Sequence, residues 1–139
     1  MKIGLVSCTS TKQPGNWPAR ELYWPSAIFR KSVLYCEHCY DAWYILSAKH
    51  HLVHPDQMLE YYQLAIGDLT RPQQERWGRI VSAQLRALGD NVEFFALAPA
   101  QYLRYLQGVL VTEVLAGLRQ GERQHWMAEQ PASFGISDW

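Results

Sequence analysis

The chain of 139 residues carries 13 basic and 13 acidic side chains, so its formal net charge is zero. A hydrophobic share of 48% and a charged share of 19% are typical of a globular domain and argue against disorder. The balanced charge weighs against a general nucleic-acid binder, which usually carries a surplus of basic residues. We therefore expect one folded α/β domain over residues 1–139.

Cysteine usage and hydropathy favour a cytoplasmic protein. Three cysteines, an odd number, in a chain long enough to build a core without disulfides are typical of a reduced intracellular protein. The opening MKIGLVSC is too short for the apolar region of a secretory signal. No stretch approaches the roughly 18 apolar residues that span a membrane. We expect no membrane partner.

Strands and helices alternate from the N-terminus onward. Residues 2–7 (KIGLVS) are a short apolar run that predicts a buried first strand. Residues 26–39 predict a helix, because Ser26 can cap it and apolar residues recur along one face. Residues 43–46 (WYIL) predict a second buried strand.

The second half continues this alternation. Residues 51–69 are expected to be mostly loop, with a short helix or an extended lid over 59–64. The clearest helix covers residues 71–88, with Pro72 in its first turn and Gly89 just past its end. The elements predicted after it are a strand over 92–97, a helix over 99–106, a strand over 109–114, a helix over 117–127 and a loose tail after about 131.

This order of elements is the pattern of a three-layer α/β sandwich with a mainly parallel, four-stranded sheet. In open α/β sheets, ligands bind beyond the carboxyl ends of the strands. The first predicted strand ends in the polar segment SCTSTK (residues 7–12), and the second ends in SAKHH (residues 47–51). We therefore expect the functional site where these two segments meet.

The segment SCTSTK offers hydroxyls, backbone N–H groups and Lys12, which suit a phosphate or a carboxylate. It is neither a P-loop nor a GxGxxG motif. In the segment SAKHH, Lys49 can hold a negative charge, and His50 can transfer protons near neutral pH. The alternatives are a polar loop with a solvated lysine and a loop histidine satisfied by backbone groups.

Carboxylates and tyrosines follow the second strand. Glu60 near a histidine can act as a general base or bind a sugar hydroxyl, and Tyr62 can stack on a base or close a lid. The alternative is a short helix capped by Asp56. Arg20 can reach a phosphate and Tyr23 can stack on a base, but an internal ion pair beside a packed tyrosine explains them equally well.

Cys36 and Cys39 form a CxxC spacing at a helix end. A structural zinc site usually needs four ligands, commonly as two well-spaced pairs, and the second pair is missing here. We expect no metal site.

Three stretches resemble a family of small bacterial and phage proteins of unknown function. They are VSCTSTK, ARELYWPSAIFRKSVLYCE and DAWYILSAKHHLVHPDQMLEYYQL, which resemble the family patterns VSCxxxK, AxxLYxSxxF and LSAKHGLVxP. A later stretch, VLVTEVLAGLRQGERQHWM, resembles the closing segment of that family. The resemblance spans roughly residues 3–127 and is most specific around 44–62.

This family is distantly similar to the peroxide-stress protein YaaA and to uracil-DNA-glycosylase-like α/β domains. The resemblance implies a uracil-DNA-glycosylase-like or Rossmann-like fold and a role involving nucleotides, nucleobases or DNA. The chain departs from the family at His51, where glycine is usual. Glycine would suit a left-handed turn, which histidine adopts only at some cost. By motif, the resemblance marks Ser7, Cys8, Lys12, Arg20, Tyr23, Ser47, Lys49, His50, Pro55, Glu60 and Tyr62.

Together these features favour an enzyme that processes a nucleotide, nucleobase or nucleic acid, with hydrolysis of an N-glycosidic bond as the specific reaction and no cofactor. His50 and Glu60 are the predicted catalytic residues. The predicted binding residues are Ser7, Cys8, Lys12, Arg20, Tyr23, Ser47, Lys49 and Tyr62. The alternatives are a non-catalytic module that binds a nucleotide or nucleic acid in stress response or phage defence, and a protein–protein adaptor.

Overall fold

A five-stranded sheet forms the centre of the computed structural model, which describes residues 1–133. The strand order is β4-β3-β1-β6-β7, and only β4 runs antiparallel to its neighbour. The bounds are β1 Lys2–Ser7, β3 Ala42–Ser47, β4 His51–Val53, β6 Glu93–Leu97 and β7 Val111–Glu113. The prediction of a mainly parallel sheet is confirmed, with five strands instead of four.

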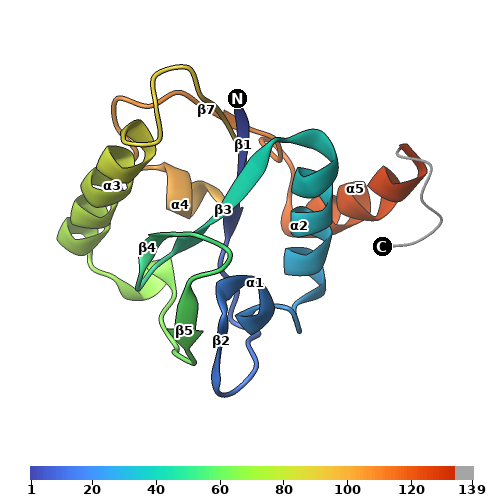
Figure 1. The fold of residues 1–139 in the computed structure, drawn as a ribbon, viewed down its shortest axis with the longest axis horizontal. Coiled ribbons are helices and arrows are strands. Elements are labelled where there is room, and N and C mark those ends of the chain that lie inside the picture. The colour runs from blue at the N-terminus through green and yellow to red at the C-terminus, as the bar shows by residue number, and fades with distance from the viewer. Residues whose placement is uncertain (134–139) are drawn as a thin grey trace.

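Helices cover both faces of this sheet (Figure 1). α2 (Ala27–Cys39) and α5 (Gln120–Ser133) lie on one face, and α3 (Arg71–Arg86) and α4 (Ala100–Leu103) lie on the other. The predicted cap of α2 is confirmed, because the Ser26 hydroxyl accepts a hydrogen bond from the Phe29 N–H at 3.3 Å. No helix of the described residues is long and apolar enough to cross a membrane.

Several predicted boundaries shift. α3 ends at Arg86 and not at residue 88, and α5 begins at Gln120 and not at residue 117. α4 is a single turn that ends at Leu103, three residues before the predicted end. The helix α5 continues to Ser133, so the predicted loose tail is helical over its first residues. The rest of that tail lies outside the described residues.

The segment predicted as mostly loop contains two three-residue strands. β4 pairs back onto β3, with Val53 opposite Ile45. β5 (Met58–Glu60) pairs with β2 (Asn16–Pro18) in a separate two-stranded ribbon, so residues 59 and 60 are extended and no helix follows Asp56. The ribbon is followed by no regular structure until the 3-10 turn η1 (Ile66–Asp68).

The ribbon and the short helix α1 (Ala19–Leu22) lie beyond the carboxyl ends of β1 and β3 (Figure 1). Two backbone hydrogen bonds attach α1 to the segment after β4: the N–H of Ala19 donates to the Gln57 carbonyl at 2.8 Å, and that of Arg20 to the Pro55 carbonyl at 2.9 Å. The segments that follow β1 and β4 are therefore held side by side, and at the strand ends the Cys8 N–H donates to the Leu46 carbonyl at 2.9 Å.

β1 lies in the middle of the sheet and is buried along most of its length. Gly4 faces α2 so closely that a Cβ atom there would lie 2.4 Å from Cys36 Sγ and 2.9 Å from Tyr40 Cδ2. Glycine at this position lets the helix pack directly on the central strand.

Gly4→Ala should therefore lower the free energy of unfolding by about 1–3 kcal/mol, the usual effect of overpacking a core. Denaturant unfolding measures it. Gly67→Ala is the control, because nothing lies within 4 Å of a Cβ at Gly67. The double variant with Cys36→Ala should recover part of the loss, and equal losses at Gly4 and Gly67 would contradict the close approach.

His51 has φ of 65°, the left-handed conformation that the glycine of the family pattern described above led us to expect at this position. It is the one non-glycine residue with positive φ among the described residues. A left-handed conformation costs an L-residue roughly 1–2 kcal/mol. His51→Gly should therefore be more stable than His51→Ala by about 1 kcal/mol in denaturant unfolding. The two variants lose the same imidazole, so a more stable alanine variant would rule out backbone strain.

Candidate functional site

Tyr62 lies at the centre of a buried hydrogen-bonded group near the carboxyl end of β3. Its hydroxyl is hydrogen-bonded to Ser47 Oγ at 2.8 Å and to the Tyr23 hydroxyl. Ser47 Oγ also accepts a hydrogen bond from the backbone N–H of His50 at 3.0 Å. Burial raises the pKa of both tyrosines, so their hydroxyls stay protonated and neutral.

Basic side chains gather around Tyr62. The Nζ atoms of Lys12 and Lys49 lie 4.7 and 5.7 Å from the centre of its ring, and the His50 ring packs edge-on at 5.1 Å between centroids. We call Lys12, Lys49, His50 and Tyr62 the cationic cluster. No ion pair within residues 1–133 involves either lysine. Positive charge without a carboxylate partner favours binding of an anion.

The environment also changes proton affinity in the cationic cluster. Partial burial lowers the pKa of Lys12. Burial, followed by the charges of Lys49 and His51, lowers the pKa of His50 below its usual value of 6.5. At neutral pH the His50 ring is therefore neutral and able to accept a proton. An anion bound nearby would favour the protonated ring and oppose this shift.

The two tyrosines do not offer the stacking surface expected from the sequence. Tyr23 is 0% exposed and Tyr62 is 5% exposed, and they pack against each other in a T-shaped pair with centroids 6.4 Å apart. This burial weighs against a stacking role for either ring on a nucleobase. Their hydroxyls instead join the segment after α1 to the end of β3.

Cys8 follows β1 and is buried. It lies on the side of the sheet that α3 and α4 cover. Its N–H donates to the Leu46 carbonyl at 2.9 Å, and its Sγ is 3.2 Å from the Tyr102 hydroxyl. Trp77 of α3 packs against Tyr102 and donates its indole N–H to the Ser47 carbonyl at 2.8 Å. The sequence analysis marked neither Tyr102 nor Trp77 as a site residue, because each is an apolar position within a helix.

Among the described residues, Arg20 and Glu60 make no hydrogen bond or ion pair with the lysines or the histidine of the cationic cluster. Arg20 pairs with Asp56, and both side chains are largely exposed, which is close to the ion-pair alternative expected for Arg20. Glu60 is exposed in β5, where its backbone lies opposite Asn16. Within residues 1–133 no hydrogen bond or ion pair joins Glu60 to His50. The catalytic roles of His50 and Glu60 stay predictions.

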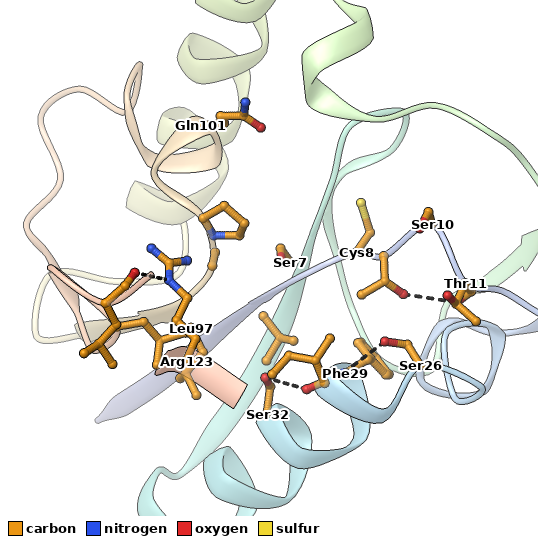
Figure 2. Close-up of a pocket in the computed structure, with 17 residues that line it drawn as sticks. Ser7, Cys8, Ser10, Thr11, Ser26, Phe29, Ser32, Leu97, Gln101 and Arg123 are labelled. Atoms are coloured by element: carbon orange, nitrogen blue, oxygen red, sulfur yellow. Dashed lines mark hydrogen bonds between the residues drawn. The ribbon is translucent and has the colours of Figure 1, made fainter. Parts of the chain in front are cut away.

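A cavity of about 640 Å³ opens beside the loop that follows β1. Figure 2 shows its walls, which come from the end of β1 with its loop, the first turns of α2, the end of β6 and the start of α5. Ser7 and Cys8 line this cavity, whereas Lys12, Lys49 and His50 do not. The hydroxyl residues in its walls are Ser7, Thr9, Ser10, Thr11, Ser26 and Ser32.

The CxxC cysteines both lie on α2. Cys36 is buried, and burial raises the pKa of its thiol. Cys39 is partly buried. In the part of the chain that the structure describes, no three His, Cys, Asp or Glu side chains meet as metal ligands would.

Tyr62→Phe removes the hydroxyl that joins Ser47 and Tyr23, and it leaves both of their hydroxyls short of a buried partner. The free energy of unfolding should fall by about 1–3 kcal/mol. Tyr61→Phe is the control, because the Tyr61 hydroxyl bonds only to the exposed Gln63 side chain at 2.5 Å. Thermal or denaturant unfolding measures both, and an unchanged Tyr62→Phe would show that the network contributes little.

Comparison with known proteins gives a family and no named relative. No curated protein and no solved structure matches the chain significantly. The distant similarity to YaaA and to uracil-DNA-glycosylase-like domains stays a prediction. The model of a family of unknown function, DUF6884, matches residues 3–129, consistent with the resemblance to an uncharacterised family. The chain belongs to this family of unknown function, DUF6884.

Proposed function

We propose that the protein is an enzyme that processes a phosphate-bearing nucleotide at the carboxyl ends of β1 and β3. One observation carries the proposal: Lys12 and Lys49 converge on one buried aromatic ring, and no carboxylate of the described residues neutralises them. Ligands of open α/β sheets bind at this edge. A phosphate would supply the missing negative charge.

His50 is the proposed proton-transfer group. Its lowered pKa keeps the ring neutral at pH 7, and it lies beside the lysines that would hold the phosphate. The reaction that we propose is hydrolysis of an N-glycosidic bond, in which His50 accepts a proton from the attacking water and the base leaves with its bonding electrons. This reaction needs no redox cofactor.

The second candidate is a non-catalytic nucleotide-binding module. Glu60 makes no hydrogen bond or ion pair with His50 among the described residues, and this favours the binding module, because an oxocarbenium-like transition state is usually stabilised by a nearby carboxylate. The same lysines would then serve binding alone.

Ligand-induced thermal stabilisation tests the binding part of both candidates. A nucleotide present at 100 times its Kd adds about 2.7 kcal/mol to the folded state and should raise Tm by several degrees. Lys49→Ala and Lys12→Ala should each weaken binding about tenfold, the usual effect of losing one charge-assisted hydrogen bond. Lys31→Ala is the matched control, since Lys31 lies on α2 outside the cationic cluster. Equal stabilisation of all three variants would contradict the site.

Product analysis on the ligand found in this way separates the enzyme from the binding module. His50→Ala should abolish turnover and preserve binding, whereas His54→Ala, an exposed histidine after β4, should keep both. Glu60→Gln tests the remaining predicted catalytic residue. Nucleotide binding without release of a free base in the wild type would leave the binding module as the function.

A further inference from the structure

The cavity beside β1 has the size of a small-molecule site. Its volume of about 640 Å³ lies within the usual range for ligand pockets, about 300–1,000 Å³. Arg123 and Phe29 approach it from different helices, and the loop after β1 forms the opposite wall (Figure 2). The function proposed above does not use this space.

Its walls have two kinds of surface. An apolar part formed by Val6, Phe29, Leu97 and Leu115 suits a planar ring. The hydroxyl residues supply both donors and acceptors. Thr9 Oγ1 donates to the Thr11 carbonyl at 3.1 Å and keeps its lone pairs, whereas Ser26 Oγ accepts from the Phe29 N–H and keeps its proton. Such a mixture matches the hydroxyls of a sugar.

Arg123 is the charged side chain in the lining. Its Nε donates to the Leu118 carbonyl at 2.9 Å, which fixes the guanidinium at the cavity, and no carboxylate of residues 1–133 pairs with it. The remaining guanidinium nitrogens are donors only. They therefore fit a base that presents carbonyl oxygens, as guanine and uracil do.

Two connections place the cavity next to the cationic cluster. Thr11 lines the cavity, and the next residue is Lys12. Phe29 lines it as well, and its ring lies 5.2 Å from that of Tyr23, which is hydrogen-bonded to Tyr62. The cavity and the cationic cluster therefore share a boundary, made by the Thr11–Lys12 step of the loop and by the packed rings of Phe29 and Tyr23.

We propose that this cavity binds the nucleoside part of a free nucleoside monophosphate whose base carries carbonyl oxygens, with Arg123 as the base-recognition residue. The proposal rests on the proposed function for the phosphate at Lys12 and Lys49. It favours a mononucleotide over a nucleic-acid strand, because a strand needs open stacking surfaces and a basic groove, whereas Tyr23 and Tyr62 are buried and the net charge is zero.

Titration calorimetry with GMP, UMP, guanosine, uridine and a single-stranded decamer of DNA tests this proposal. At least one nucleoside should bind the wild type. Arg123→Ala should weaken the binding of that nucleoside and of its monophosphate alike, by about tenfold. This loss is within the usual range for one bidentate arginine contact. Lys49→Ala should weaken the binding of the monophosphate and leave the binding of the nucleoside unchanged. Arg123→Lys, which keeps the charge and loses the fork, should behave like Arg123→Ala.

Arg119→Ala is the matched control, because Arg119 is exposed, precedes α5 and does not line the cavity. Unfolding of each variant without ligand shows whether it folds. Monophosphate binding that depends on Lys49 and not on Arg123, or a decamer that binds more tightly than either monophosphate, overturns the cavity proposal and leaves the lysine site standing. If nucleoside binding depends on Arg123 and Lys49→Ala leaves the affinity for the monophosphate unchanged, the cavity proposal is supported and the lysine site is overturned. Absence of binding by every mononucleotide and nucleoside overturns both.

Discussion

The hydroxyl of Tyr62 is the contact on which the architecture of the site depends. It joins Tyr23, from the segment after α1, to Ser47 at the end of β3, and Ser47 in turn holds the backbone of His50. A buried hydroxyl without a partner costs about 1–3 kcal/mol. The hydrogen bonds of these hydroxyls therefore depend on one another, because losing one group leaves another without its partner. No buried polar side-chain atom of residues 1–133 lacks a partner. The segment after α1, the segment after β5 and the end of β3 are therefore joined by one polar network.

The same contact determines the charge of the site. Because burial keeps the Tyr62 hydroxyl protonated, the ring that Lys12 and Lys49 approach is neutral and cannot offset their charge as a phenolate would. A cation–π contact contributes only about 0.5–1 kcal/mol at a partly exposed site. The lysines are thus positioned without being neutralised. An anion from solution is the partner that this arrangement lacks, which is the physical basis for proposing a phosphate-bearing ligand.

The sequence predicted the inner strands and the meeting of Lys12 with Lys49, for two physical reasons. Strands buried on both faces are continuous apolar runs, and parallel strands end at one edge of the sheet. The sequence did not predict β4 or β5, because three residues are too few to show the alternation of apolar and polar side chains that marks a strand. Such a strand forms only through pairing with another segment. Burial of Tyr23 and Tyr62 and the place of Arg123 at the cavity follow from how the ribbon and α5 pack. Such long-range packing leaves no local pattern in the chain.

The strained residue His51 connects the backbone to this chemistry. Residues 48–50 form the turn between β3 and β4, and the left-handed conformation at His51 lets β4 pair back onto β3 at once, with His51 opposite Ser47. A longer connection would carry Lys49 and His50 away from Tyr62. The turn is also closed from within, since the His50 N–H bonds to Ser47 Oγ. Unfavourable backbone geometry persists where surrounding contacts enforce it, and it is often found at functional sites. Here the enforcing contacts are the β3–β4 pairing and the Tyr62 network, so the strain at His51 keeps a lysine and a histidine at the edge where the ligand is proposed to bind.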